Sequence, residues 1–94
     1  MNIVFEALAH PIRRGILEIL KGGSKSAGEL AEAFEVSKPT MSGHFAKLRE
    51  AGLIQADQKG ATIIYSINLS VLEEVVLGFM GKMGGSNTGE GDAA

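Results

Sequence analysis

The segment from Lys38 to Glu50 places small and polar side chains on one side of a predicted helix. At about 100° per residue, Met41, Phe45 and Leu48 fall together on the opposite, apolar side. The polar side and its flanks are formed by Pro39, Thr40, Ser42, Gly43, Ala46, Lys47 and Glu50. Small residues permit close approach of a partner, and hydroxyl and amino groups bond phosphates and base edges. The pattern therefore predicts contact with duplex nucleic acid.

An ordinary solvated helix surface is the alternative interpretation of this polar side. Such a surface favours the charged and amide residues that form helices better than serine, threonine and glycine do. Gly43 in mid-helix costs about 1 kcal/mol relative to alanine, which favours selection by a partner. The residues expected to contact DNA from this helix are Lys38, Pro39, Thr40, Ser42, Gly43, His44 and Lys47. For His44, at the edge of the apolar side, a structural hydrogen bond and a phosphate contact both stay open.

Catalysis and metal binding have few candidate residues in this chain. The sequence contains two histidines and no cysteine, which excludes disulfides, zinc–thiolate sites, iron–sulfur clusters and thiol redox sensing. No acid–base pair accompanies a glycine-rich loop. His10 precedes Pro11, where capping or turn packing is the expected role. We predict no catalytic residue, no metal site and no cofactor.

Local signals in the first part of the chain predict two helices. A short helix begins near Ile3 and ends near Ala9. Pro11 suits the first turn of a second helix, because its missing N–H would have no partner there. The pair Gly22-Gly23 ends this helix. Arg13 and Arg14 lie on it, and either phosphate contacts or a solvated face would explain them.

Two further helices follow with a very short turn between them. Ser26 and Glu29 form a capping box at the start of the third helix. Residues 35–36 leave only a few positions for the turn. Ser37 is the expected N-cap of the fourth helix, which carries the polar side described above, and Gly52 ends it.

The last part of the chain predicts a hairpin and a fifth helix. Residues 53–56 and 62–67 have the pattern of short strands, and residues 57–61 join them. Lys59 and Gly60, at the tip of this loop, are expected to reach a phosphate or the minor groove. A final helix is predicted from about Leu69 to Met83.

Two short helices with a tight turn, followed by a hairpin, predict a winged helix-turn-helix. The fold class is mainly α with a small β-hairpin, with about five helices and a two-stranded wing. In this arrangement the second helix of the pair enters the major groove. We predict one domain over residues 1–83, and a small, polar, disordered tail over residues 84–94.

The distribution of charge supports a nucleic-acid partner better than the net charge does. The chain carries a net charge of −2, whereas DNA-binding domains are usually basic. Residues 36–66 nevertheless hold four basic and two acidic side chains, and the rest of the chain holds five basic and nine acidic ones. The basic excess therefore coincides with the predicted fourth helix and wing.

Three segments resemble the ArsR-type winged-helix regulators. Residues 7–17 (ALAHPIRRGIL), residues 37–54 (SKPTMSGHFAKLREAGLI) and the wing residues 59–60 and 64–68 match their motifs. The resemblance covers Ile3 to about Met83, and it is greatest to the branch of small, cysteine-free autorepressors, the SdpR-like group. It implies a dimeric bacterial repressor that binds operator DNA through the recognition helix and the wing.

The sequence departs from many ArsR-type proteins at positions that bind metals or DNA. Many members of the family sense metals through cysteine pairs, or through His and acidic ligands on the last helix. This chain lacks cysteine, and its last helix offers only Glu73 and Glu74, which point about 100° apart. Gly43 occupies a position where the family often has a large basic residue. We therefore predict no metal sensing.

The terminal helices predict a homodimer. The last helix carries a continuous apolar stripe, and 45% hydrophobic residues exceed what the core of so small a domain needs. The predicted interface consists of Ile3, Val4, Leu8, Leu69, Leu72, Val76, Phe79, Met80 and Met83. The alternative is that these helices only cover the core of their own protomer.

The partners and location follow from these patterns. We expect double-stranded DNA and a second copy of the chain as partners, and a cytoplasmic location, because no signal peptide and no membrane span is visible. The competing function is a winged-helix module for protein–protein contact, which would show no salt-dependent DNA binding. The inducing signal stays open among a small ligand, a regulatory protein partner and concentration alone.

Overall fold

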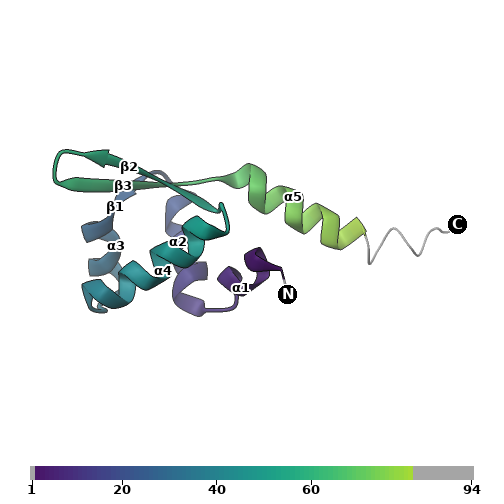
Figure 1. Cartoon of the computed structure of the whole chain (residues 1–94), viewed down its shortest axis with the longest axis horizontal. Coiled ribbons are helices and arrows are strands. Elements are labelled where there is room, and N and C mark those ends of the chain that lie inside the picture. Colours follow the sequence, from purple (N-terminus) through teal and green to yellow (C-terminus); the bar gives the residue numbers. More distant parts are fainter. Residues whose placement is uncertain (1, 82–94) are drawn as a thin grey trace, which may run out of the picture.

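The computed structural model describes residues 2–81, which form five helices and a three-stranded antiparallel sheet (Figure 1). The elements are α1 (Ile3–Leu8), α2 (Pro11–Leu20), β1 (Lys25–Ser26), α3 (Ala27–Phe34), α4 (Lys38–Glu50), β2 (Ile54–Lys59), β3 (Thr62–Ile67) and α5 (Leu69–Met80). The predicted winged helix-turn-helix is thereby confirmed. Met83 and the predicted tail, residues 84–94, lie outside the described residues.

Side-chain caps start three of the helices at the predicted residues. Ser26 Oγ accepts from the Glu29 backbone N–H at 3.1 Å, and Glu29 accepts from the Ser26 N–H at 2.8 Å. Ser37 Oγ accepts from a backbone N–H in the first turn of α4. His10 Nδ1 accepts from the Ile12 N–H at 3.1 Å, so His10 is the N-cap of α2. Local capping therefore fixes where α2, α3 and α4 begin.

The sheet differs from the predicted hairpin in two respects. The strand order is β1-β3-β2, so β3 is the central strand and β1 is an edge strand that the sequence did not predict. Strand β2 continues to Lys59, which pairs with Thr62, so the predicted loop over residues 57–61 is wrong. Only Gly60 and Ala61 form the turn, and Gly60 has a φ of +63°, a conformation that glycine adopts without strain.

The hydrophobic core lies between α1, α2, α3, α4, the start of β2 and the middle of β3. Its largest fully buried side chains are Ile16, Leu20, Leu30, Met41, Leu48 and Leu53. The rings of Phe45 and Tyr65 join α4 to β3 at a centroid distance of 4.4 Å. The predicted apolar side of α4 is therefore buried, and the packing holds the helix in a fixed rotation about its axis.

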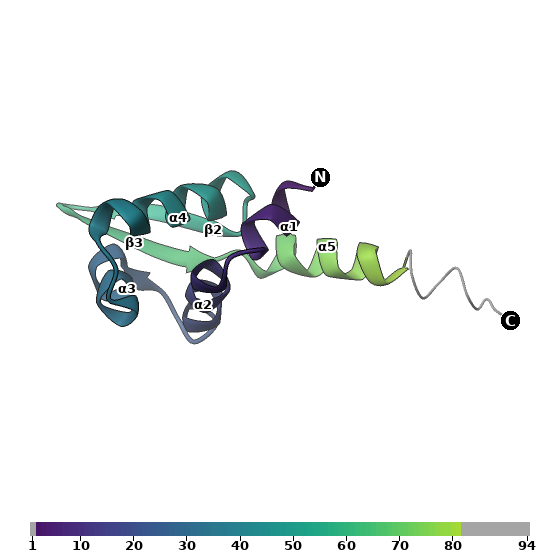
Figure 2. The ribbon, with the colours of Figure 1, turned by 90° about the horizontal axis from the view of Figure 1, so that it is seen from below.

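Helix α5 projects beyond the body of the domain with α1 beside it (Figures 1 and 2). Seen from below in Figure 2, α4 lies along one side of the body, and α2 and α3 lie along the other. The rings of Phe5 and Phe79 meet edge to face at 5.5 Å and connect α1 to α5. No residue of α5 is buried within the protomer.

Candidate nucleic-acid interface

The outer face of α4 consists of Lys38, Pro39, Thr40, Ser42, Gly43, Ala46 and Lys47, and every one of these residues is exposed. It is the side opposite the buried Met41, Phe45 and Leu48. A Cβ added at Gly43 would meet no atom within 4 Å, and the residue does not have a positive φ. Neither packing nor backbone conformation within the protomer therefore requires glycine here. A partner surface that approaches the helix closely at Gly43 would explain the glycine.

The first turn of α4 offers donors to an anionic partner. Ser37 Oγ donates to Thr40 Oγ1 at 2.9 Å, which leaves the Thr40 hydroxyl hydrogen available for an acceptor outside the protein. Lys38 is exposed in the same turn. The helix dipole adds partial positive charge at this end, so phosphate binding is favoured.

The wing presents Lys59 and Gly60, both exposed, at the end of the hairpin. Lys59 Nζ lies 3.7 Å from the carboxylate of Asp57, with both side chains largely exposed. Such a solvated ion pair contributes little, so the lysine can exchange it for a phosphate. Gln58 donates to the Gly60 carbonyl at 2.8 Å and shapes the turn. No local pattern in the sequence predicts the contact between Lys59 and Asp57.

His44 is buried in the protomer rather than placed on the outer face of α4. Its exposed fraction is 9%. Arg13 Nη1 lies 3.2 Å from His44 Nδ1, and the ring of His10 is 4.4 Å away between centroids. Of the two roles left open for His44, the structure supports the structural hydrogen bond. The predicted DNA contact by His44 is wrong, because the side chain faces α2.

Arg13 and Arg14 connect α2 to the end of α1. Arg13 donates to the carbonyls of Ala7 at 2.8 Å and Glu6 at 3.1 Å. Arg14 donates to the Leu8 carbonyl at 2.7 Å. The Ala7 and Leu8 carbonyls lie in the last turn of α1, where carbonyls lack partners within the helix, and basic side chains satisfy them favourably. The Glu6 carbonyl also accepts from the Ala9 N–H at 3.2 Å. Both alternatives from the sequence, phosphate contact and a solvated face, missed this structural role.

The stability of the protein is expected to fall in mild acid because of His44. Burial chiefly, and then the positive charge of His10 and Arg13, lower the pKa of His44. The unfolded chain, with an ordinary histidine pKa of about 6.5, therefore binds the proton more readily. Stability is complete above that pH and is lost as the pH falls below it toward the folded-state value. Urea unfolding across this range measures the slope, and His44→Gln should flatten it. Equal slopes in the two proteins would contradict the prediction.

Residues 2–81 contain no group of three or more His, Cys, Asp or Glu side chains placed to hold a metal ion. The exposed Glu73 and Glu74 of α5 are the acidic pair that the sequence singled out. In the same range, no helix has the length and apolar character that a membrane crossing requires.

Comparison with known proteins assigns this geometry to a family. Residues 10–56, from the cap of α2 into β2, match the family described as "Bacterial regulatory protein, arsR family". Over 85 residues the chain is 45% identical to the transcriptional repressor SdpR of Bacillus subtilis (strain 168). The matched segment covers 87% of this chain and 94% of SdpR. The chain belongs to the arsR family. Its relatives and its fold identify it as a DNA-binding transcriptional repressor of that family. The relatives and the fold belong to transcription regulators and not to enzymes.

Further similar proteins include an arsenic resistance regulator and two solved structures. The chain is 40% identical over 70 residues to the arsenic resistance regulator ArsR1 of Pseudomonas putida, covering 73% of this chain and 55% of that one. A crystal structure of an ArsR family transcriptional regulator superposes with a TM-score of 0.81 at 28% identity, over 87% of this chain and 90% of the other. HlyU from Vibrio cholerae superposes with a TM-score of 0.70 at 26% identity, over 87% of this chain and 88% of HlyU.

Proposed function

We propose that this arsR-family protein binds a pseudo-palindromic operator in the cytoplasm as a homodimer and represses transcription without sensing metals or thiols. The observation that carries the proposal is the outer face of α4. This face is exposed, small and polar, its glycine has no packing reason, and the opposite face is locked into the core. A groove-docking helix requires these properties.

The DNA contacts divide by chemistry. The residues proposed to reach base edges are Lys38, Pro39, Thr40, Ser42 and Gly43. Lys47 is placed on the flank of the outer face, where its ammonium group meets a backbone phosphate. Lys59 and Gly60 at the tip of the wing meet a phosphate or the minor groove. Phosphate contacts position the helix, and base contacts give the sequence preference.

The two classes of contact predict two different mutant phenotypes. Lys47→Ala should weaken binding to all duplexes alike and reduce the salt slope by about two, one for each protomer of the dimer. Ser42→Ala should change the preference at one base pair per half-site, by about 1–3 kcal/mol. Fluorescence anisotropy with duplexes selected by the parent protein, at several salt concentrations, separates the two effects. Parent-like binding by both variants at physiological salt would overturn the assignment.

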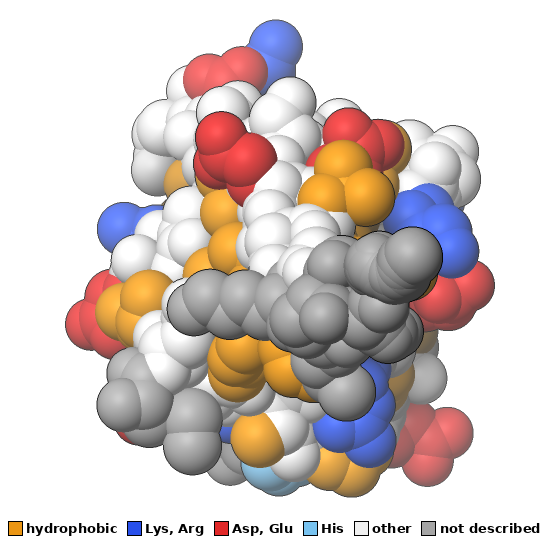
Figure 3. Space-filling view, turned by 90° about the vertical axis from the view of Figure 1, so that its right-hand side faces the viewer, with side chains coloured by type: hydrophobic (Ala, Val, Ile, Leu, Met, Phe, Trp, Pro, Cys, Tyr) orange, Lys and Arg blue, Asp and Glu red, His pale blue; other side chains and the backbone are white. Residues whose placement is uncertain are grey.

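The homodimer is supported by apolar side chains that the protomer leaves uncovered. Large exposed hydrophobic residues occur only on α1 and α5 within residues 2–81, and they are Ile3, Leu69, Val76, Leu77, Phe79 and Met80. Figure 3, which looks toward the α5 end of the molecule, shows apolar side chains gathered there. A small protein rarely exposes so many large apolar residues together unless they meet a partner.

We narrow the proposed interface to the side chains that the protomer leaves exposed. Val4 is only 5% exposed and belongs to the core of its own protomer, so we leave it out of the proposed interface. Leu8 and Leu72 are partly buried against that core. Ile3, Leu69, Val76, Phe79 and Met80 keep their proposed role. Met83 lies outside the described residues.

Operator binding is expected to be independent of metals and thiol reagents. The chain has no cysteine, and soft ions such as cadmium and arsenite need thiolate ligands for tight binding. Titration of the protein–operator complex with zinc, cadmium or arsenite should leave the dissociation constant unchanged. A stoichiometric metal site that shifts operator affinity would exclude this part of the proposal.

A further inference from the structure

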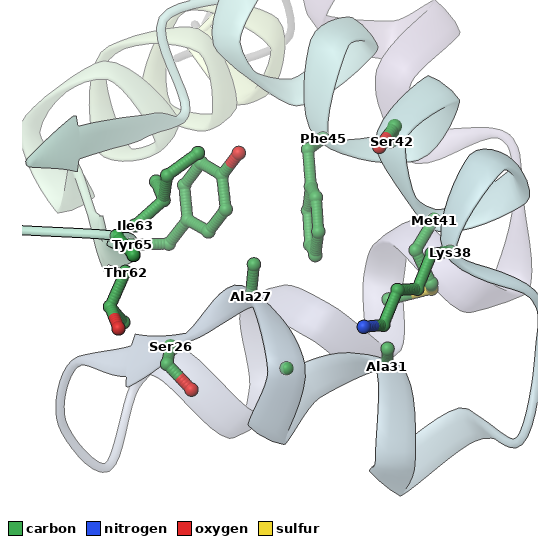
Figure 4. A pocket seen from close by; sticks show the side chains of 12 residues that line it. Ser26, Ala27, Ala31, Lys38, Met41, Ser42, Phe45, Thr62, Ile63 and Tyr65 are labelled. Carbon is green, nitrogen blue, oxygen red and sulfur yellow. The ribbon is translucent and has the colours of Figure 1, made fainter. Parts of the chain in front are cut away.

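A cavity of about 360 Å³ lies between the start of α3, the first turns of α4 and strand β3. Figure 4 shows residues that line it. They are Ala27 and Ala31 of α3, Lys38 and Phe45 of α4, and Thr62 and Tyr65 of β3. The volume is at the lower end of the range for small-molecule sites. The cavity therefore suits a compact ligand.

The walls of the cavity define the chemistry of that ligand. The side chains of Ala27, Ala31 and Ile63 form the accessible apolar wall, and the rings of Phe45 and Tyr65, only 4% and 3% exposed, lie behind it. Among residues 2–81, Lys38 is the only charged residue that lines the cavity, and no carboxylate does. Its ammonium group is directed into the space between Ala31 and Phe45 (Figure 4). Within residues 2–81 Lys38 forms no ion pair.

We propose that this cavity binds a small monocarboxylate with a flat or short apolar body. The carboxylate pairs with Lys38, and the apolar body packs against Ala27, Ala31 and Ile63. Burial of the apolar body removes its surface from water, and the single uncompensated lysine selects one negative charge. A neutral molecule of the same shape gains only the first of these contributions.

Occupancy of the cavity reduces operator affinity, an extension that rests on the proposed function. Lys38 and Ser42 line the cavity and also belong to the outer face of α4. A bound carboxylate neutralises the Lys38 charge that DNA would otherwise meet. Ligand and DNA therefore compete for one side chain, and each lowers the affinity of the protein for the other.

The binding test uses amide NMR spectra of the full chain titrated with hexanoate, phenylacetate and 2-naphthoate. At least one carboxylate should give saturable shifts at Gly28, Lys38 and Thr62, and phenylacetamide, the neutral isostere of phenylacetate, should bind at least about tenfold more weakly. Lys38→Gln should abolish this preference, whereas Lys25→Gln, an equal charge change outside the cavity, should keep it. Thr62→Phe, which fills the mouth, should block binding. Absence of saturable shifts with all three carboxylates up to about 10 mM, or equal binding of acid and amide, overturns the proposal.

A second experiment tests the regulatory step. It measures operator binding by fluorescence anisotropy with and without the carboxylate that binds most tightly. The ligand should raise the apparent dissociation constant of the parent several-fold and leave that of Lys38→Gln unchanged. Ligand binding with an unchanged operator constant would overturn the regulatory step alone. A protein that binds no duplex DNA would overturn the proposed function, while the NMR titration would still decide the chemistry of the cavity.

Discussion

Replacing Val76 and Phe79 together with aspartate is expected to convert the protein to a monomer and to lower its operator affinity by about a hundredfold or more. Both side chains are exposed on α5, 39% and 49% respectively, so the protomer does not need them for its own core. Four buried carboxylates across a two-fold interface would have no compensating partner. Each protomer would then hold one half-site alone and lose the avidity of paired binding.

Sedimentation equilibrium at micromolar concentration measures the first effect, and fluorescence anisotropy measures the second. The matched control is Asn68→Asp with Ser70→Asp, which adds the same two charges at the start of α5, in the turns before Val76 and Phe79. The control should remain dimeric and bind DNA. A Val76 and Phe79 double variant that is folded, dimeric and active on DNA would place the interface elsewhere.

Gly43→Glu is expected to stabilise the fold and at the same time to abolish operator binding. The site has open space around it and no positive φ, so a longer side chain is accommodated. Glutamate is the better helix former by roughly 0.5–1 kcal/mol, which corresponds to a rise in Tm of a few degrees for a domain of this size. On the outer face of α4 it would bring a carboxylate against the phosphates and bases, where like-charge repulsion is severe.

The opposite signs of these two effects make the test specific for DNA docking. Thermal unfolding gives the stability, and anisotropy on the selected duplex gives the affinity, with an expected loss of at least about a hundredfold. Ala33→Glu, on the exposed side of α3, adds the same charge away from the outer face and should retain most of the affinity. A Gly43→Glu variant that binds as tightly as the parent would show that this face remains in solvent.

Sequence patterns predicted the elements whose determinants are local. The capping box at Ser26, the cap at Ser37 and the stop at Gly52 depend on residues a few positions apart, and all three are present. The rotation of α4 follows from the spacing of its apolar residues, because helical geometry fixes which of them share a face. These local signals were sufficient to predict the fold and to predict which residues of α4 are exposed on its outer face, with the exception of His44.

Features set by tertiary contacts could not be predicted in the same way. Strand β1 has only two residues, too few for any periodicity, and exists because β3 offers it an edge. The burial of His44 depends on Arg13 and His10, which approach it from α2 and its cap. In the six-residue α1, Ile3 and Val4 have the same apolar character, and only packing against the body decides which one is buried.

The most direct test of the account is a hydroxyl-radical footprint of the full chain on an operator selected from random duplexes. Two α4 helices related by a two-fold axis should protect two symmetric patches with centres about one helical turn, roughly 34 Å, apart or a multiple of that distance. The selected sequence should be pseudo-palindromic about the same centre, and the protection should weaken steeply with salt. A single asymmetric patch would contradict the dimeric docking of α4, and the absence of any protection at physiological salt would contradict DNA recognition by this face.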